Sequence, residues 1–229
     1  MSAIGILGGM GPQASARLVE LIVAQTPNFV SNPTDSDFPE IILLSVPVPN
    51  FISSESNMSK AKEILINRTK LLENSGSTIN CIACNTAHLL LPDLKRVTKV
   101  PFLSIPALVA NLIKKRKFKR IGLLATPNTL KSTLYDEAIG NSAVIVRPSR
   151  KLSEKTESLI FKQLNGTITI KEKENFRTMV DNFLEANNLD SVILGCTELP
   201  LIFGDSKDDR IIDTLEVLSE GLLSSIFNQ

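Results

Sequence analysis

Large polar aromatic side chains are scarce in this chain, which has no tryptophan and one tyrosine among 229 residues. Such rings stack on bases and sugars, so their scarcity argues against a stacking platform for either ligand. A surplus of charge is also lacking, because 25 lysines and arginines balance 24 acidic residues to a formal net charge of +1. The chain therefore has no strong positive field to attract nucleic acid. Its composition predicts an ordinary soluble globular protein.

Cysteines are few and odd in number, since the chain contains three. This count predicts no disulfide framework. The first residues, Met1 to Gly5, have neither the basic region nor the long apolar stretch of a signal peptide. No apolar run approaches the roughly 20 residues that a membrane span needs. We therefore expect a cytoplasmic protein in a reducing environment that binds neither nucleic acid nor membrane.

Short β-prone runs alternate with helical patterns along the chain. Expected strands cover residues 3–7, 40–45, 78–84, 100–104, 142–147 and 190–196, and a further strand starts at residue 120. Expected helices cover residues 15–25, 59–74, 89–97, 107–114, 131–137, 153–164, 171–185 and 214–226, the last folding back onto the first part of the chain. This alternation predicts parallel sheets with helices on both faces and a ligand site at the carboxyl ends of the strands.

A glycine-rich loop, Gly8-Gly9-Met10-Gly11-Pro12, follows the first expected strand. It is not the G-x-G-x-x-G pattern of dinucleotide-binding proteins, and it lacks the Gly-Lys-Ser/Thr ending of a phosphate-binding P-loop. Glycine allows a tight turn and a close approach of the backbone to a ligand. We favour binding of a small anion or substrate by backbone N–H groups, and a purely structural turn is the alternative.

Two cysteines, Cys84 and Cys196, stand where an expected strand ends and small polar residues begin. A helix N-terminus after such a turn favours negative charge and lowers the pKa of a thiol. Each cysteine taken alone would more often be a small buried apolar residue. Cys81 and Cys84 also form a C-x-x-C pattern, but residues three apart in a strand point to opposite faces. We therefore interpret Cys81 as a core residue.

Two pairs of similar motifs predict an internal duplication. Ile4-Gly5-Ile6-Leu7 and Ile121-Gly122-Leu123-Leu124 lie 117 residues apart, and Cys84 and Cys196 lie 112 apart. The nearly equal offsets predict an α/β protein of two pseudo-symmetric, Rossmann-like lobes, each a mainly parallel sheet flanked by helices. The first lobe is expected to comprise residues 1–98 plus 211–229, and the second residues 99–210. Each lobe would bring one thiol to an active site in the cleft between them.

Four motifs together resemble a known family: Gly5 to Pro12, Cys84 to His88, Gly122 to Thr126, and Gly195 to Pro200. In order and spacing they resemble the aspartate/glutamate racemase family over nearly the whole chain, and they are most similar to the aspartate racemases. The resemblance implies two α/β lobes with the active site between them. It also implies a homodimer that needs no cofactor, whether pyridoxal phosphate, metal or nucleotide.

The activity that the resemblance implies is racemisation of aspartate, with glutamate as the second choice. Exchange of an α-proton between the two faces of an amino acid needs a base on one face and an acid on the other. Cys84 and Cys196 would alternate in these roles, one as thiolate and the other as thiol. The residues implied to bind or orient the substrate are Met10, Gly11, Asn85, Thr86, Thr126, Asn128, Thr129, Lys155, Thr197 and Glu198.

Two departures from the family pattern bear on the substrate. Phe51 stands where aspartate racemases commonly have an arginine for the distal carboxylate, and a phenyl ring cannot form such a clamp. Pro127 and Asn128 replace a common Thr-Gly pair. Either Lys155 or another cation would replace the arginine, or the substrate is a less acidic amino acid.

Several alternatives stay open at the level of the sequence. His88, the one histidine of the chain, could tune the thiolate, contact the substrate, or be a helix residue behind the site. The chain could be a broad-specificity amino-acid racemase, or a related isomerase or decarboxylase on the same scaffold. It could also be an amino-acid-binding protein without catalytic activity.

Overall fold

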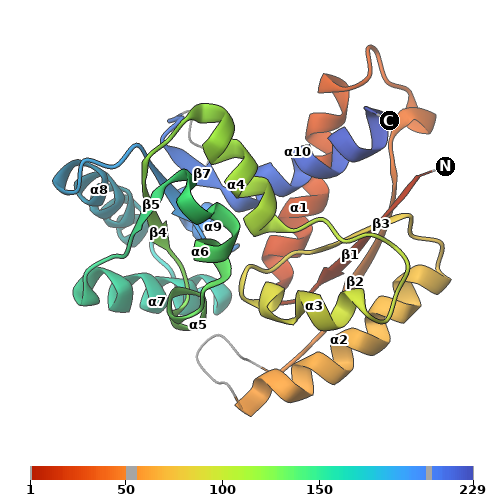
Figure 1. The fold of residues 1–229 in the computed structure, drawn as a ribbon, viewed down its shortest axis with the longest axis horizontal. Helices are drawn as coiled ribbons and strands as arrows, with labels where there is room; N and C mark the ends of the chain where they lie inside the picture. The colour runs from red at the N-terminus through yellow and green to blue at the C-terminus, as the bar shows by residue number, and fades with distance from the viewer. Residues whose placement is uncertain (1, 50–55, 205–207, 229) are drawn as a thin grey trace. The chain divides into compact units, whose positions relative to one another are not determined.

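The computed structural model describes residues 2–49, 56–204 and 208–228 (Figure 1). The chain forms two compact units. The first comprises Met1–Ile105 and Leu215–Gln229, and the second comprises Pro106–Thr214. Within the described ranges, no helix combines the length and the apolar character required to cross a membrane.

The first unit is built on a parallel sheet of three strands, β1 (Ala3–Gly8), β2 (Glu40–Ser45) and β3 (Ile79–Ile82), in the order β2-β1-β3. In register, Ile4 of the central strand lies beside Ile41 of β2 and Ile79 of β3. Every residue of β1 and β3 is buried, as expected for a parallel sheet covered on both faces. The carboxyl ends of all three strands therefore meet at one edge.

Helices cover both faces of this sheet (Figure 1). One side holds α2 (Ser56–Asn74), the 3₁₀ helix η3 (Thr86–Leu90) and α3 (Leu91–Lys95), whose apolar residues form one cluster with Leu7 and Ile82. The other side holds α1 (Pro12–Gln25) and α10 (Thr214–Phe227). Phe29, which follows the short helix η1 (Thr26–Asn28), stacks on Phe227 with ring centroids 6.1 Å apart. The 3₁₀ turn η2 (Asp35–Asp37) precedes β2.

The second unit repeats this plan and adds one strand. Its parallel sheet contains β4 (Arg120–Leu124), β5 (Val144–Val146), β6 (Ser191–Leu194) and β7 (Ile211–Asp213) in the order β5-β4-β6-β7. Its helices are α5 (Pro127–Lys131), α6 (Leu134–Ile139), η4 (Gly140–Ser142), α7 (Arg150–Leu164), α8 (Ile170–Ala186) and α9 (Leu199–Phe203). The chain enters this unit through α4 (Ile105–Arg116). The predicted fold class is thus confirmed, because β2-β1-β3 and β5-β4-β6 are equivalent.

The repeated Ile-Gly motif has the same physical cause in both central strands. A Cβ atom on Gly5 would lie 2.2 Å from Asn80 Oδ1, and one on Gly122 would lie 2.6 Å from the Phe183 ring. Such distances are far below van der Waals contact, so both positions need a residue without a side chain. The motif therefore reflects close packing in the middle of each sheet.

The strand predicted at residues 100–104 is wrong as a regular strand, and β7 was not predicted. Phe102 forms an isolated parallel bridge with Asn80 of β3, and the Asn80 N–H donates to the Pro101 carbonyl at 2.8 Å. Proline has no N–H to continue a ladder, so the pairing stops there. In the second unit β7 pairs regularly with β6. It is three residues long, too short for a periodic pattern to reveal.

Two predicted helices are divided differently in the structure. The helix predicted at 131–137 is replaced by α5 and α6, because Ser132 has an extended conformation and its hydroxyl donates to the Thr129 carbonyl at 2.8 Å. The helix predicted at 89–97 is replaced by η3 and α3. Pro92 lies in the first turn of α3, where a missing N–H costs no hydrogen bond.

Candidate active site

The glycine loop is held by a buried serine, Ser15, which belongs to none of the motifs described above. Gly9 has φ of +91°, and a Cβ atom there would lie 2.3 Å from the Val46 backbone nitrogen. The Gly9 N–H donates to Ser15 Oγ at 2.9 Å, and Ser15 Oγ donates to the Gly11 carbonyl at 3.1 Å. The Gly9 N–H is therefore engaged within the loop. Any substrate contact of this loop must come from its other groups, among them Met10 and Gly11.

Cys84 lies in the turn that follows β3. The Ala83 N–H donates to the Leu7 carbonyl at 2.9 Å and extends the pairing of β3 with β1 by one residue. Cys84, Asn85 and Thr86 follow, all buried, and η3 begins at Thr86. The helix expected here is thus a five-residue 3₁₀ helix, which presents backbone N–H groups at its start with a weaker dipole than a long α-helix.

Cys81 and His88, which lie near Cys84 in the sequence, are both buried. Cys81 lies inside β3 and is fully buried, and this burial raises the pKa of its thiol. Its position agrees with the interpretation of Cys81 as a core residue. The His88 ring also lies in the interior, with Nδ1 2.8 Å from the Cys84 carbonyl oxygen and Nε2 3.1 Å from the Ile105 backbone nitrogen. Both ring nitrogens therefore have backbone partners.

Cys196 occupies the equivalent place in the second unit, after β6. The Gly195 N–H donates to the Leu124 carbonyl at 2.7 Å and extends the pairing of β6 with β4. The Cys196 thiol donates to Glu198 Oε2 at 2.9 Å, and the Thr197 hydroxyl reaches the same oxygen at 3.3 Å. Cys196, Thr197 and Glu198 are all buried. Glu198, predicted as a substrate ligand, thus lies beside the thiol itself.

Thr126, Asn128 and Thr129 form the neighbouring turn of the second unit. Thr126 is the N-cap of α5, where its Oγ1 accepts the Thr129 N–H at 3.3 Å and donates to Thr129 Oγ1 at 3.1 Å. All three side chains are buried. Because β4 lies directly beside β6, this turn and Cys196 emerge at the same edge of the sheet. In the first unit β1 lies beside β3, and the glycine loop and Cys84 emerge together in the same way.

Three further residues bear on the site, namely Lys155, Phe51 and Tyr135. Lys155 lies half-buried on α7, and its predicted contact with a carboxylate stays a prediction. Phe51, the residue in place of an arginine, lies outside the described residues. Tyr135, on α6, is buried, and this burial, with a smaller Coulombic contribution from Cys196, raises the pKa of its phenol. No motif surrounds Tyr135, so its place near Cys196 could not be predicted from the sequence.

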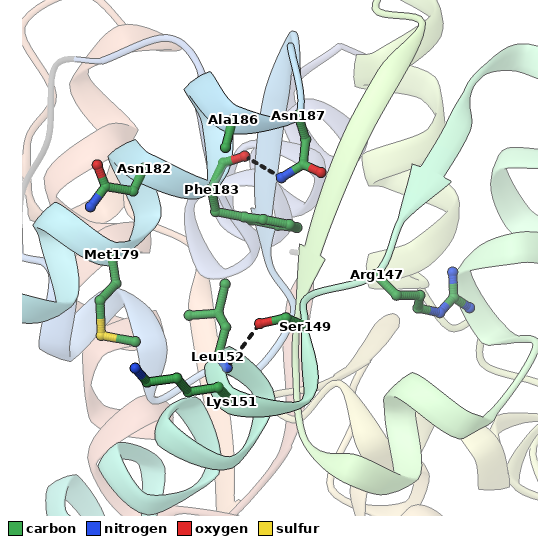
Figure 2. Close-up of a pocket in the computed structure, with 9 residues that line it drawn as sticks. All are labelled: Arg147, Ser149, Lys151, Leu152, Met179, Asn182, Phe183, Ala186 and Asn187. Carbon is green, nitrogen blue, oxygen red and sulfur yellow. Dashed lines mark hydrogen bonds between the residues drawn. The ribbon is translucent and has the colours of Figure 1, made fainter.

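A separate pocket of about 320 Å³ lies between the start of α7 and the end of α8 (Figure 2). Its apolar lining includes Leu152, Met179 and Phe183, and Lys151 contributes a charge at its side. Ser149 caps α7 there by accepting the Leu152 N–H at 3.3 Å. None of the predicted substrate or catalytic residues lines it. This pocket is therefore distinct from the two cysteine turns.

Comparisons with known proteins agree with this architecture. A crystal structure of an aspartate racemase homologue from Pyrococcus horikoshii OT3 superposes with a TM-score of 0.81 at 28% identity, covering 100% of both chains. The aspartate racemase of Picrophilus torridus has a TM-score of 0.78 at 27% identity, covering 98% of this chain and 94% of the other. The broad specificity amino-acid racemase RacX of Bacillus subtilis (strain 168) is 23% identical over 226 residues, 97% of each chain. The family model for Asp/Glu/Hydantoin racemase matches residues 7–220. This chain belongs to the Asp/Glu/Hydantoin racemase family.

Proposed function

We propose that this protein is a cofactor-independent amino-acid racemase in which Cys84 and Cys196 act on opposite faces of one substrate Cα. The observation that supports this most strongly is the equivalence of the two cysteines. Each follows the strand beside the central strand of its sheet, β3 next to β1 and β6 next to β4. A two-base reaction that inverts one stereocentre needs two such groups.

The proposed reaction moves one proton off Cα and another one on. A thiolate at one cysteine takes the α-proton, and the thiol at the other cysteine donates its proton to the opposite face. Inversion in the reverse direction exchanges these roles. Backbone N–H groups and side chains at the two turns, from Asn85, Thr86 and Thr197, would bind the α-carboxylate and stabilise the charge that develops. Glu198 accepts the Cys196 S–H and would keep that thiol oriented.

Aspartate is the first substrate to test. The two similar structures named above are an aspartate racemase homologue and an aspartate racemase. A broader specificity is the second candidate, because RacX, a broad specificity amino-acid racemase, matches nearly the full length of the chain. Phe51 in the sequence, where an arginine is common, also favours testing less acidic amino acids.

The decisive experiment is proton-to-deuterium exchange at Cα in D₂O, followed by NMR with no cofactor added. L- and D-forms of aspartate, glutamate and several neutral amino acids are compared in parallel. Exchange accompanied by inversion is expected for aspartate, and exchange confined to neutral amino acids would move the substrate class. If amino acids bind but none of them exchanges its α-proton, the racemase is refuted and a binding protein is favoured.

Cysteine variants test the two-base mechanism. Cys84→Ala and Cys196→Ala are each expected to abolish inversion, since either change removes the acid or base of one face. Cys81→Ala is the matched control because its thiol is buried inside β3, and it should retain inversion. Substrate should also slow alkylation of both Cys84 and Cys196. Full activity in either active-site variant would exclude the mechanism.

A homodimer in the cytoplasm completes the proposal. The family resemblance supports the dimer, and the few cysteines of the chain support a reducing cytoplasm. Light scattering on the purified protein should give twice the chain mass of 25.0 kDa. A monomer that is fully active would contradict the dimer and leave the chemistry untouched.

A further inference from the structure

His88 is a buried titratable residue that the proposed reaction does not use. It lies in η3, and the pair Cys84 and His88 is separated by four positions. Helical side chains lean back toward the preceding turn, which brings the imidazole over the Cys84 carbonyl. Nδ1 lies 2.8 Å from that oxygen, and the Ile105 N–H donates to Nε2 at 3.1 Å.

The two partners of the ring specify one protonation state. A backbone carbonyl can only accept a hydrogen bond, so Nδ1 must carry the proton. A backbone N–H can only donate, so Nε2 must be bare. Burial lowers the pKa of His88 to about 4, which leaves the ring neutral at pH 7. His88 therefore has no nitrogen left over for a substrate.

The imidazole links two parts of the first unit that are distant in sequence. One partner is the carbonyl of the cysteine itself. The other is the first residue of α4, whose N–H has no acceptor within its own helix. The Asn80–Phe102 bridge ties the same connecting segment to β3. His88 thus completes a second link between the end of β3 and the start of α4.

The second unit secures its cysteine differently. Pro200 stands at the position equivalent to His88 and offers no such ring. There the hydroxyl of Thr214, the first residue of α10, donates to the Leu194 carbonyl at 3.0 Å. The hydrogen bond that joins the end of β6 to the start of α10 therefore does not involve the Cys196 carbonyl. The Cys196 thiol instead bonds to Glu198.

We propose that His88 is a positioning residue for Cys84, a neutral Nδ1–H imidazole that clamps the Cys84 carbonyl to the first N–H of α4. The clamp fixes the backbone at the thiol-bearing residue and so sets the direction of Sγ. The catalytic part of this inference rests on the proposed racemase function. Misplacement of a reacting group by about 1 Å can cost on the order of 100-fold in rate.

The protonation state can be tested without activity. The chain has one histidine, so ¹⁵N-histidine labelling gives the two ring nitrogens of His88 alone. The wild-type protein at pH 7 is expected to show a protonated Nδ1 and an unprotonated Nε2. A protonated Nε2, in the other tautomer or in an imidazolium, would overturn the clamp whatever the enzyme does.

Two substitutions separate the two hydrogen bonds of the clamp. His88→Asn puts an amide N–H near the place of Nδ1 and keeps the bond to Cys84. His88→Gln puts an amide oxygen near the place of Nε2 and keeps only the bond to Ile105. We expect His88→Gln to lower kcat about tenfold or more with KM nearly unchanged, and His88→Asn to stay within about threefold of wild type.

The control is Thr69→Val in α2 of the same unit, where a buried hydroxyl donates to the Leu65 carbonyl at 2.9 Å. It removes a similar buried bond far from Cys84 in the chain and should leave kcat unchanged. Equal loss of kcat in the two His88 variants, or the reverse order, would overturn the positioning role. If the wild-type protein shows no exchange, the proposed function fails. The clamp can still be tested by the NMR result and by alkylation of Cys84, which should be faster in His88→Gln than in His88→Asn.

Discussion

Mild acid is expected to destabilise the fold through His88. The pKa of this side chain is lowered from 6.5 to about 4, mainly because burial disfavours its charged form. Between these two pKa values, His88 is therefore protonated in the unfolded chain and neutral in the folded chain. The stability from neutral His88 is complete above about pH 6.5 and is lost as the pH falls toward 4.

The size of the effect follows from the difference in pKa. Each pKa unit corresponds to about 1.4 kcal/mol, so lowering the pH from about 6.5 to about 5 should lower the free energy of unfolding by about 2 kcal/mol. Carboxyl groups with a lowered pKa act in a more acidic range, because unfolded Asp and Glu titrate at about 4. They are Asp37, Asp93, Glu172, Asp190 and Asp208. The interval above pH 5 therefore reports mainly on the one histidine.

Urea unfolding at pH 7, 6, 5.5 and 5 measures this effect. Far-UV circular dichroism is the suitable signal, since the chain has no tryptophan. His88→Asn leaves the Ile105 N–H without its acceptor and should cost about 1–3 kcal/mol at pH 7. That difference from wild type should shrink by about 2 kcal/mol at pH 5. A difference that stays constant with pH, as we expect for Thr69→Val, would refute the reasoning.

Three further substitutions test the contacts around the two cysteines and the central strands. Glu198→Gln replaces a charged acceptor of the Cys196 thiol by a neutral one, at a cost of about 1–2 kcal/mol, and should lower kcat about 5- to 30-fold. Gly9→Ala should lower the free energy of unfolding more than Gly76→Ala does. It should also reduce activity more in the exchange assay. Gly122→Ala should lower the free energy of unfolding by about 1–3 kcal/mol, because its Cβ would lie 2.6 Å from the Phe183 ring.

Matched variants make the outcomes for Glu198 and Gly9 specific. L- and D-substrates have equal free energies, so Glu198→Gln must lower kcat/KM equally for both, and Glu154→Gln on the surface should lower neither. Gly76 shares a positive φ of +93° with Gly9 at +91°, but a Cβ atom on Gly76 would have no atom of the described residues within 4 Å, whereas the Val46 backbone crowds Gly9. Equal stabilities of Gly9→Ala and Gly76→Ala would show that backbone strain alone explains the loss.

Local pattern in the sequence determined much of this protein. The strand predicted at 40–45 has the same bounds as β2, because a run of aliphatic residues between a polar connection and two prolines allows little else. The Ile-Gly motifs and the two cysteines predicted the duplication, since equivalent strands with equivalent neighbours need similar residues. Patterns visible in the residue order were enough for these features.

Only the tertiary structure decided the features that depend on distant partners. The bridge of Phe102 and the strand β7 both rest on pairing with segments distant in the sequence. The roles of His88 and Ser15 follow from which buried donors and acceptors lie beside them. Tyr135 is a neighbour of Cys196 only after folding. A buried polar group must find its partner in space, and residue order alone does not specify that partner.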